Sequence, residues 1–385
     1  MAWTDGESDM YIYFFGFTIS LIIFVLISKG MVIKNKVGGR KENHLIISRV
    51  SFALFWSAIP PTLIAALRYD VGTDYFPTYY TGFYRILENS KVDRFEIGYY
   101  YFNKIIQLFT DNAFALFIIT SILFVGISYK AIGDLSINIP FSIVLFFVTR
   151  YYFIGLNAVR QYIAMAILLH SIKYIQTRNL KKFLLCILCA CIFHYTSIIF
   201  ILTYFIGRID VTKKQFIILS IGDVLVCSIG VTGLKYILGN SKYGVIINTI
   251  GVAGVAFSVI TIIINLIIVI YAFTNKEKNK DDTIYLIYFN IQLVAFWVSL
   301  ILRFLPAAER VYWIFSFPII VSLPYFISHG NKYRKIFKYI IILIYLIYMI
   351  YDIVILKDHN VIPYNWIFGK ESVYDSGWIK YKYLW

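Results

Sequence analysis

The sequence predicts an all-α, polytopic integral membrane protein. Of its 385 residues, 60% are hydrophobic, and the mean hydropathy is +0.73, which is too apolar for a surface that faces water. Apolar runs of roughly 20 residues, the length of a membrane-spanning helix, recur along nearly the whole chain. Runs such as 257–273 lack the alternation of a barrel strand, and helices also satisfy every backbone group in lipid. We expect about 10 spanning helices in a single transmembrane domain, residues 1–385.

The apolar runs define the predicted helices in chain order. The first run lacks both a basic region before it and a small-residue cleavage site after it, so we expect it to be retained as a span. The runs fall at about 10–29, 47–67, 113–129, 140–153, 158–176, 183–206, 215–231, 251–273, 283–301, 311–328 and 339–356.

The net charge of +15 is distributed as short Lys and Arg clusters between the apolar runs. Such clusters mark cytoplasmic loops, so the charge encodes topology and argues against nucleic acid as a partner. With every cluster in the cytoplasm, both termini are expected on the non-cytoplasmic side. The clusters lie at 29–41, 178–182, 208–214, 276–280 and 332–338.

One run must return to the side on which it starts. If every run crossed once, the cluster at 208–214 and the later ones would lie outside. The run 183–206 is the candidate, because the polar residues of Phe193-His194-Tyr195-Thr196-Ser197 interrupt its middle. We expect a broken or hairpin helix near 183–206 that turns near His194, since irregular backbone at membrane depth is tolerated where it is buried in protein or lines a cavity.

This topology gathers several polar segments on the outer side. The segment 68–112 is long and rich in Tyr and Phe, so we expect interfacial helices within it. Its aromatic rings suit both stacking on sugars and anchoring at the membrane interface, and anchoring is the commoner reason. The other outer segments are 154–160, 232–250, 303–310 and the C-terminal tail 357–385.

Four arginines of these segments suit an anionic ligand. Arg160 opens a predicted helix, whose N-terminus adds a positive field and free amides, although snorkelling to the interface would also explain it. If the four converge on one cavity, their guanidinium forks match the oxygens of a diphosphate. The four are Arg68, Arg160, Arg303 and Arg310.

Three residues are candidate general bases. Asp70 and Asp74 lie just after a span, beside Arg68, although an ordinary solvated loop with local ion pairs has the same composition. His194 lies at the predicted helix break, where a buried histidine bonded to backbone is the alternative. The sequence contains no P-loop, HExxH, GxSxG or metal-ligand cluster, so we expect no cofactor and no metal.

These motifs resemble the EpsG-type bacterial exopolysaccharide proteins, which are similar to the Wzy-type O-antigen and capsule polymerases. The resemblance covers about 68–205, and beyond 205 it consists mostly of hydropathy and the Arg-bearing loop. Tyr162 departs from the family, in which a smaller residue is expected. The residues that carry the resemblance are Arg68-Tyr69-Asp70-Val71-Gly72-Thr73-Asp74, Glu96-Ile97-Gly98-Tyr99-Tyr100, Asn103, Asn157-Ala158-Val159-Arg160-Gln161-Tyr162-Ile163-Ala164, Lys181-Lys182-Phe183 and Phe193-His194-Tyr195-Thr196-Ser197.

The resemblance implies a membrane glycosyltransferase of GT-C-like architecture in the bacterial cytoplasmic (inner) membrane. It would polymerise polysaccharide repeat units carried on undecaprenyl diphosphate, at the outer face of that membrane and without a metal. Its partners would be these lipid-linked oligosaccharides, the bilayer, and flippase and chain-length regulator proteins.

Within this hypothesis, Arg160 and Arg303, supported by Arg310 and Arg68, bind the diphosphate. Asp74 or Asp70 is the first choice of base, with His194 as the rival. A lipid-linked oligosaccharide flippase or transporter, and a membrane acyltransferase acting on a polysaccharide, are the alternative functions. The expected substrate-binding residues are Glu96, Tyr99, Asn157 and Gln161.

Overall fold

The computed structural model describes residues 10–32, 42–90, 92–238, 252–302 and 308–370. Helices dominate these residues, and their one β-type pairing is an isolated antiparallel bridge between Arg68 and Trp366. The described part of the chain therefore has the all-α class that the sequence predicts.

Six helices are long and apolar enough to cross a membrane, and two bent helix pairs raise the number to eight. The chain is thus built as a multi-pass membrane protein, with fewer spans in its described part than the expected ten or so. The six spans belong to α1 (Met10–Val32), α2 (Glu42–Ala66), α5 (Phe114–Leu135), α13 (Val252–Lys276), α14 (Thr283–Leu302) and α17 (Arg334–Met349), the last continued by the π-helical turn η5 (Ile350–Ile355).

Two of the predicted runs differ from a single apolar span. The helix α8 (Val159–Gln176) carries Arg160, His170 and Lys173, so it is not a uniformly apolar span. The run 183–206 is broken, because α9 (Leu180–Phe193) ends at His194. A 3₁₀ helix, η2 (Tyr195–Ile201), and the short α10 (Leu202–Ile206) follow.

The two ends of the broken run lie together. The ring of Phe183 is 5.2 Å from that of Tyr204 and 6.5 Å from that of Phe200. A continuous helix would place residues 183 and 204 about 30 Å apart, so the chain folds back as the predicted hairpin does. Just beyond the hairpin, Arg208 donates to the carbonyl oxygens of Ile175 and Gln176 at 2.7 and 3.2 Å.

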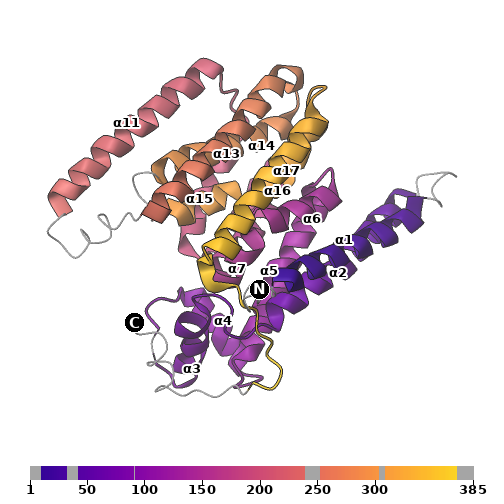
Figure 1. Ribbon diagram of the computed structural model, residues 1–385, viewed down its shortest axis with the longest axis vertical. Helices are drawn as coiled ribbons and strands as arrows, with labels where there is room; N and C mark the ends of the chain where they lie inside the picture. The colour runs from indigo at the N-terminus through magenta and orange to yellow at the C-terminus, as the bar shows by residue number, and fades with distance from the viewer. Residues whose placement is uncertain (1–9, 33–41, 91, 239–251, 303–307, 371–385) are drawn as a thin grey trace, which may run out of the picture. The chain divides into compact units, whose positions relative to one another are not determined.

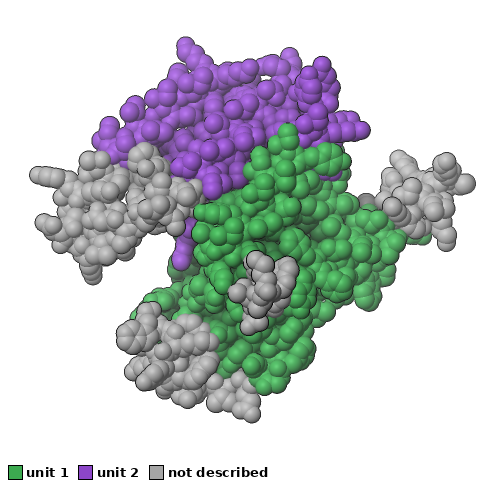
Figure 2. Space-filling view, viewed as in Figure 1, with its two compact units in different colours: residues 1–172, 185–198, 339–385 green, residues 173–184, 199–338 purple. Residues whose placement is uncertain are grey.

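The chain forms two compact units, shown in green and purple in Figure 2. Unit 1 comprises residues 1–172, 185–198 and 339–385, and unit 2 comprises 173–184 and 199–338.

In unit 1, α1 lies beside α2, and α2 packs on α5 (Figure 1). The helices α6 (Ile139–Val148) and α7 (Tyr151–Asn157) form one of the bent pairs, with a 53° bend. Arg150 at this bend has a left-handed backbone (φ 71°) and forms a buried ion pair with Asp352 of η5.

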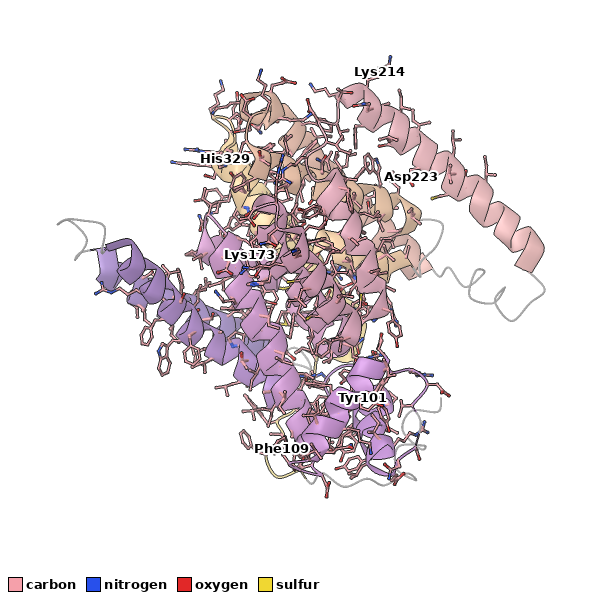
Figure 3. The ribbon with its side chains drawn as sticks, turned by 180° about the vertical axis from the view of Figure 1, so that it is seen from behind. Tyr101, Phe109, Lys173, Lys214, Asp223 and His329 are labelled. Atoms are coloured by element: carbon pink, nitrogen blue, oxygen red, sulfur yellow. The ribbon has the colours of Figure 1, made fainter. Side chains whose placement is uncertain are left out.

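Short helices of unit 1 form the segment that follows α2. They are η1 (Tyr75–Tyr80), α3 (Thr81–Leu87) and α4 (Ile97–Gln107). Helix α4 buries Tyr99, Asn103 and Ile106, whereas Tyr101 and the following Phe109 are 58% and 85% exposed (Figure 3). An apolar exposed side opposite a buried one is the pattern of a helix that lies in a membrane interface.

In unit 2, α13 and α14 form a hairpin, with α11 (Lys213–Leu238) and the bent pair α15 (Glu309–Ser316) and α16 (Ile319–Ser328) packed against it. Buried amides join three of these helices. Gln292 donates to Asn265 at 2.8 Å, and Asn265 donates to the hydroxyl of Tyr312 at 2.9 Å. Hydrogen bonds of this kind hold helices together where the solvent is lipid.

Candidate functional site

Three predicted site residues of unit 1 meet in one hydrogen-bonded group. Oε1 of Glu96 lies 2.9 Å from Nδ1 of His194, and Oε2 of Glu96 accepts a hydrogen bond from Nη1 of Arg160. We call this group the Arg160–Glu96–His194 triad. It joins the start of α4, the first turn of α8 and the break after α9, segments that are far apart in the sequence.

The triad is largely withdrawn from solvent. Glu96 and His194 are 6% and 8% exposed, and the side chain of Arg160 is 14% exposed. Burial by itself would raise the pKa of Glu96, but the hydrogen bond from His194 and the charge of Arg160 outweigh it, so that pKa lies below its ordinary value. Glu96 is therefore an anion held between the permanent cation of Arg160 and the imidazole of His194.

Aromatic rings form one wall of the triad. The guanidinium of Arg160 lies over the rings of Phe95 and Tyr99, at 5.0 and 5.7 Å from their centroids. Tyr79 stacks on Phe95 at 6.4 Å and meets Tyr99 edge-on at 6.2 Å. Burial raises the pKa of the Tyr79 phenol, against the opposing effect of Arg160. The wall thus holds an arginine against neutral rings, which is a favourable cation–π arrangement.

Three polar atoms of the triad and its aromatic wall are buried without a hydrogen-bond partner among the residues that the structure describes. They are Nε of Arg160, Nε2 of His194 and the hydroxyl of Tyr99. Buried polar atoms are almost always hydrogen-bonded, so such exceptions mark places where a ligand or solvent group is expected.

The contact with Glu96 decides the chemistry of His194. A carboxylate can only accept a hydrogen bond, so Nδ1 must carry the proton that it donates to Glu96. In a neutral imidazole the lone pair then lies on Nε2. The same arrangement orients the histidine of a catalytic triad. In that form, Nε2 is the nitrogen of His194 that can accept a proton.

Asp74 is held beside the site by Asn157. Oδ1 of Asn157 accepts from the backbone N–H of Asp74 at 2.7 Å and from the hydroxyl of Thr73 at 2.9 Å. The carboxylate of Asp74 accepts from Thr78 at 2.9 Å, and its charge acts on Tyr79, which also interacts with Arg160. Asp74 thus adjoins the triad through the ring of Tyr79.

The side chain of Arg68 is buried and forms hydrogen bonds within the protein. It is 2% exposed, and it donates to the carbonyl oxygens of Ala65 and Leu156 and, at 3.3 Å, to Ser121. These contacts fasten the C-terminal ends of α2 and α7 to α5. Both terminal nitrogens of the guanidinium, on which bidentate binding of a diphosphate would depend, already donate to groups of the protein.

The remaining predicted residues lie in different settings. Asp70 has a left-handed backbone (φ 56°), and its charge acts on Tyr69 and Tyr75. Gln161 is buried in the first turn of α8. Arg310 is exposed near the start of α15 in unit 2, and Arg303 lies outside the described residues.

Sequence reasoning did not select His359, whose Nδ1 lies 3.1 Å from Nδ2 of Asn157. The sequence feature that could have indicated this residue is the polar group Asp358-His359-Asn360 directly after the last apolar run. No group of three or more His, Cys, Asp or Glu side chains within the described ranges is placed to hold a metal ion.

Comparison with known proteins gives one match. No curated protein and no solved structure matches the chain. The EpsG family model matches residues 51–366, which include every member of the triad, Asp74 and His359. This chain is a member of the EpsG family.

Proposed function

We propose that this protein is a polysaccharide polymerase that joins undecaprenyl-diphosphate-linked oligosaccharide repeat units at the outer face of the bacterial cytoplasmic membrane. Membership of the EpsG family makes it a membrane protein of polysaccharide biosynthesis. The observation that carries the finer proposal is the buried Arg160–Glu96–His194 triad, which combines a cation for a leaving group with an oriented base.

The proposed reaction is one glycosyl transfer per turnover. A hydroxyl oxygen of the acceptor repeat attacks the anomeric carbon of the donor repeat, and the bond from that carbon to the diphosphate oxygen breaks. The hydroxyl proton passes to a base, and undecaprenyl diphosphate leaves with the bonding electrons. The reaction needs a base, stabilisation of the departing anion and no nucleotide.

Arg160 is the proposed ligand of the diphosphate. Its Nη1 serves Glu96 and, at 2.7 Å, the carbonyl oxygen of Arg94. A guanidinium has five N–H donors, so others remain for a phosphate oxygen. A fixed cation in a largely dry site stabilises developing negative charge without reorganisation, which is a sufficient catalytic effect in itself.

His194 is the base that the geometry supports best. Its Nδ1 is committed to Glu96, and its Nε2 is buried without a partner in the described part of the chain. Asp74, the first choice from the sequence, has one carboxylate oxygen engaged by Thr78. We assign Asp74 to the acceptor sugar, where carboxylates commonly accept hydrogen bonds from hydroxyl groups.

The test uses purified protein in nanodiscs with lipid-linked repeat units as the sole substrate. A ladder of longer glycans is expected, and an Arg160→Ala enzyme should lengthen glycans about 10²- to 10³-fold more slowly. Arg94→Ala is the matched control, because its exposed side chain is removed while the backbone carbonyl that Arg160 uses remains. Translocation of substrate without lengthening would overturn the polymerase in favour of a flippase, and normal lengthening by Arg160→Ala would overturn the role of the arginine.

A further inference from the structure

The C-terminal segment after η5 pairs with the loop that follows α2. Backbone N–H groups of Tyr69, Gly72 and Thr73 donate to carbonyl oxygens of the tail at 2.8 to 3.0 Å. In return, the N–H of Ile367 donates to the carbonyl oxygen of Leu67 at 2.9 Å. The loop that carries Asp74 is thus held in place by a segment almost 300 residues away in the sequence, and His359 provides one of the accepting carbonyls.

The side chain of His359 extends this attachment to Asn157. The N–H of Asp74 can only donate, so the Asn157 atom that faces it must be Oδ1. The Nδ2 group of Asn157 therefore faces Nδ1 of His359 at 3.1 Å. Because an amide NH₂ group only donates, Nδ1 of His359 must carry a lone pair, and the proton of the neutral ring lies on Nε2.

We propose that His359 is a positioning residue and a proton-sensitive switch: its neutral Nδ1 orients Asn157, which holds the loop of Asp74 at the triad, and protonation of Nδ1 releases that loop. The proposal rests on the proposed function for its catalytic consequence. In the protonated ring two donors face each other across 3.1 Å. The hydrogen bond is then replaced by a repulsive contact, and Asn157 loses its fixed orientation.

The charges around His359 come from every element packed against it. Asp358 lies on its own turn, with Oδ2 3.5 Å from Nε2, while Arg150, Asp352 and Asp74 act from the bend between α6 and α7, from η5 and from the loop after α2. Burial lowers the pKa of His359, Arg150 lowers it further, and the three carboxylates oppose this. The resulting pKa lies below the ordinary value of 6.5. The neutral, holding form therefore prevails at neutral pH, and the switch operates in acid.

Two substitutions distinguish the loss of the side-chain acceptor of His359 from a change in the backbone at that residue. His359 has a left-handed backbone (φ 61°), which Gly and Asn tolerate better than other residues. His359→Asn keeps an acceptor oxygen near the position of Nδ1 and cannot be protonated, whereas His359→Gly removes the acceptor. The readout is amide hydrogen exchange at residues 72–75 of the full-length protein in nanodiscs, corrected for the intrinsic pH dependence of exchange, with glycan lengthening measured in parallel.

We expect at least tenfold faster exchange at residues 72–75 in His359→Gly than in wild type at neutral pH, and slower lengthening. Wild-type exchange should quicken below pH 6.5, whereas exchange in His359→Asn should stay slow across the range. Equal exchange in wild type and His359→Gly, or equally fast exchange in both variants, would overturn the proposal. If exchange follows expectation but wild type lengthens no glycan, the positioning role stands and the polymerase does not.

Discussion

Oε1 of Glu96 lies 2.9 Å from Nδ1 of His194, although 98 residues separate the two in the sequence. The other oxygen of the same carboxylate accepts from Arg160. Glu96 thus performs two tasks with one charge: it fixes the proton of His194 on Nδ1, and it balances the charge of a largely buried guanidinium.

Replacing Glu96 by Gln should remove both effects while preserving size. A neutral amide no longer selects the Nδ1–H form of His194 and leaves Arg160 without a counter-charge. We expect glycan lengthening to slow about 10²- to 10⁴-fold, the range of a lost general-base contribution. Glu88→Gln, an exposed change in the same segment, should stay close to wild type, and a Glu96→Gln enzyme within twofold of wild type would contradict the role of the carboxylate.

The lowered pKa of Glu96 predicts how the stability of the triad depends on pH. Because the folded pKa lies below 4.5, the unfolded chain binds the proton first as the pH falls. The contribution of Glu96 is therefore fully present above the unfolded pKa and is lost as the pH falls through the folded pKa. The difference in Tm between wild type and Glu96→Gln, measured in nanodiscs, should be constant near neutrality and shrink below about pH 4.5. A difference that grows toward acid would have the wrong sign for an ionised Glu96.

The sequence could predict the parts of this site that depend on local pattern. The polar residues around His194 predict a break because a membrane helix rarely carries them at its centre, and the apolar run that begins at residue 158 predicts the start of the helix that carries Arg160. The all-α class follows from the length of the apolar runs. Each of these inferences needs only the neighbours of a residue in the chain.

Pairing between distant segments could not be predicted in this way. Glu96 was expected to bind substrate, but its two partners are fixed by how α4, α8 and the break after α9 pack. Arg68, like Arg160, lies at the outer end of a predicted span, yet its guanidinium donates to backbone carbonyl oxygens of α2 and α7. His359 lies in a polar tail whose attachment to the loop after α2 is a tertiary contact without a sequence pattern.

The buried pair of Arg150 and Asp352 should be a principal anchor of the C-terminal segment in unit 1. Both residues are at most 4% exposed, and the guanidinium also lies over the ring of Tyr348 at 4.1 Å. Asp352→Asn leaves a buried cation without its counter-charge, which costs about 3–5 kcal/mol. The free energy of unfolding in mixed micelles measures this loss.

The matched control is the pair of Lys130 and Asp134, four residues apart on α5, with side chains 62% and 24% exposed. Lys130→Gln, at the exposed member of the pair, should change the free energy of unfolding by about 0–1 kcal/mol. Equal effects of the two substitutions would show that Arg150 and Asp352 do not form the anchor described here.

The fold-back of the run 183–206 predicts which loops share a side of the membrane. The contact between Phe183 and Tyr204, 5.2 Å between ring centroids, returns the chain to the level from which α9 starts. Residues just before and just after the hairpin must therefore lie in the same compartment, and the basic clusters favour the cytoplasm.

In a background without Cys186, Cys189, Cys191 and Cys227, the variants Arg178→Cys and Lys213→Cys should both resist a membrane-impermeant maleimide added to intact cells and react after lysis. Tyr195→Cys, 57% exposed just beyond the turn, is the comparison, and it should react from outside. If Arg178→Cys and Lys213→Cys were labelled from opposite sides, the run would cross the membrane once, and the later loops would exchange compartments.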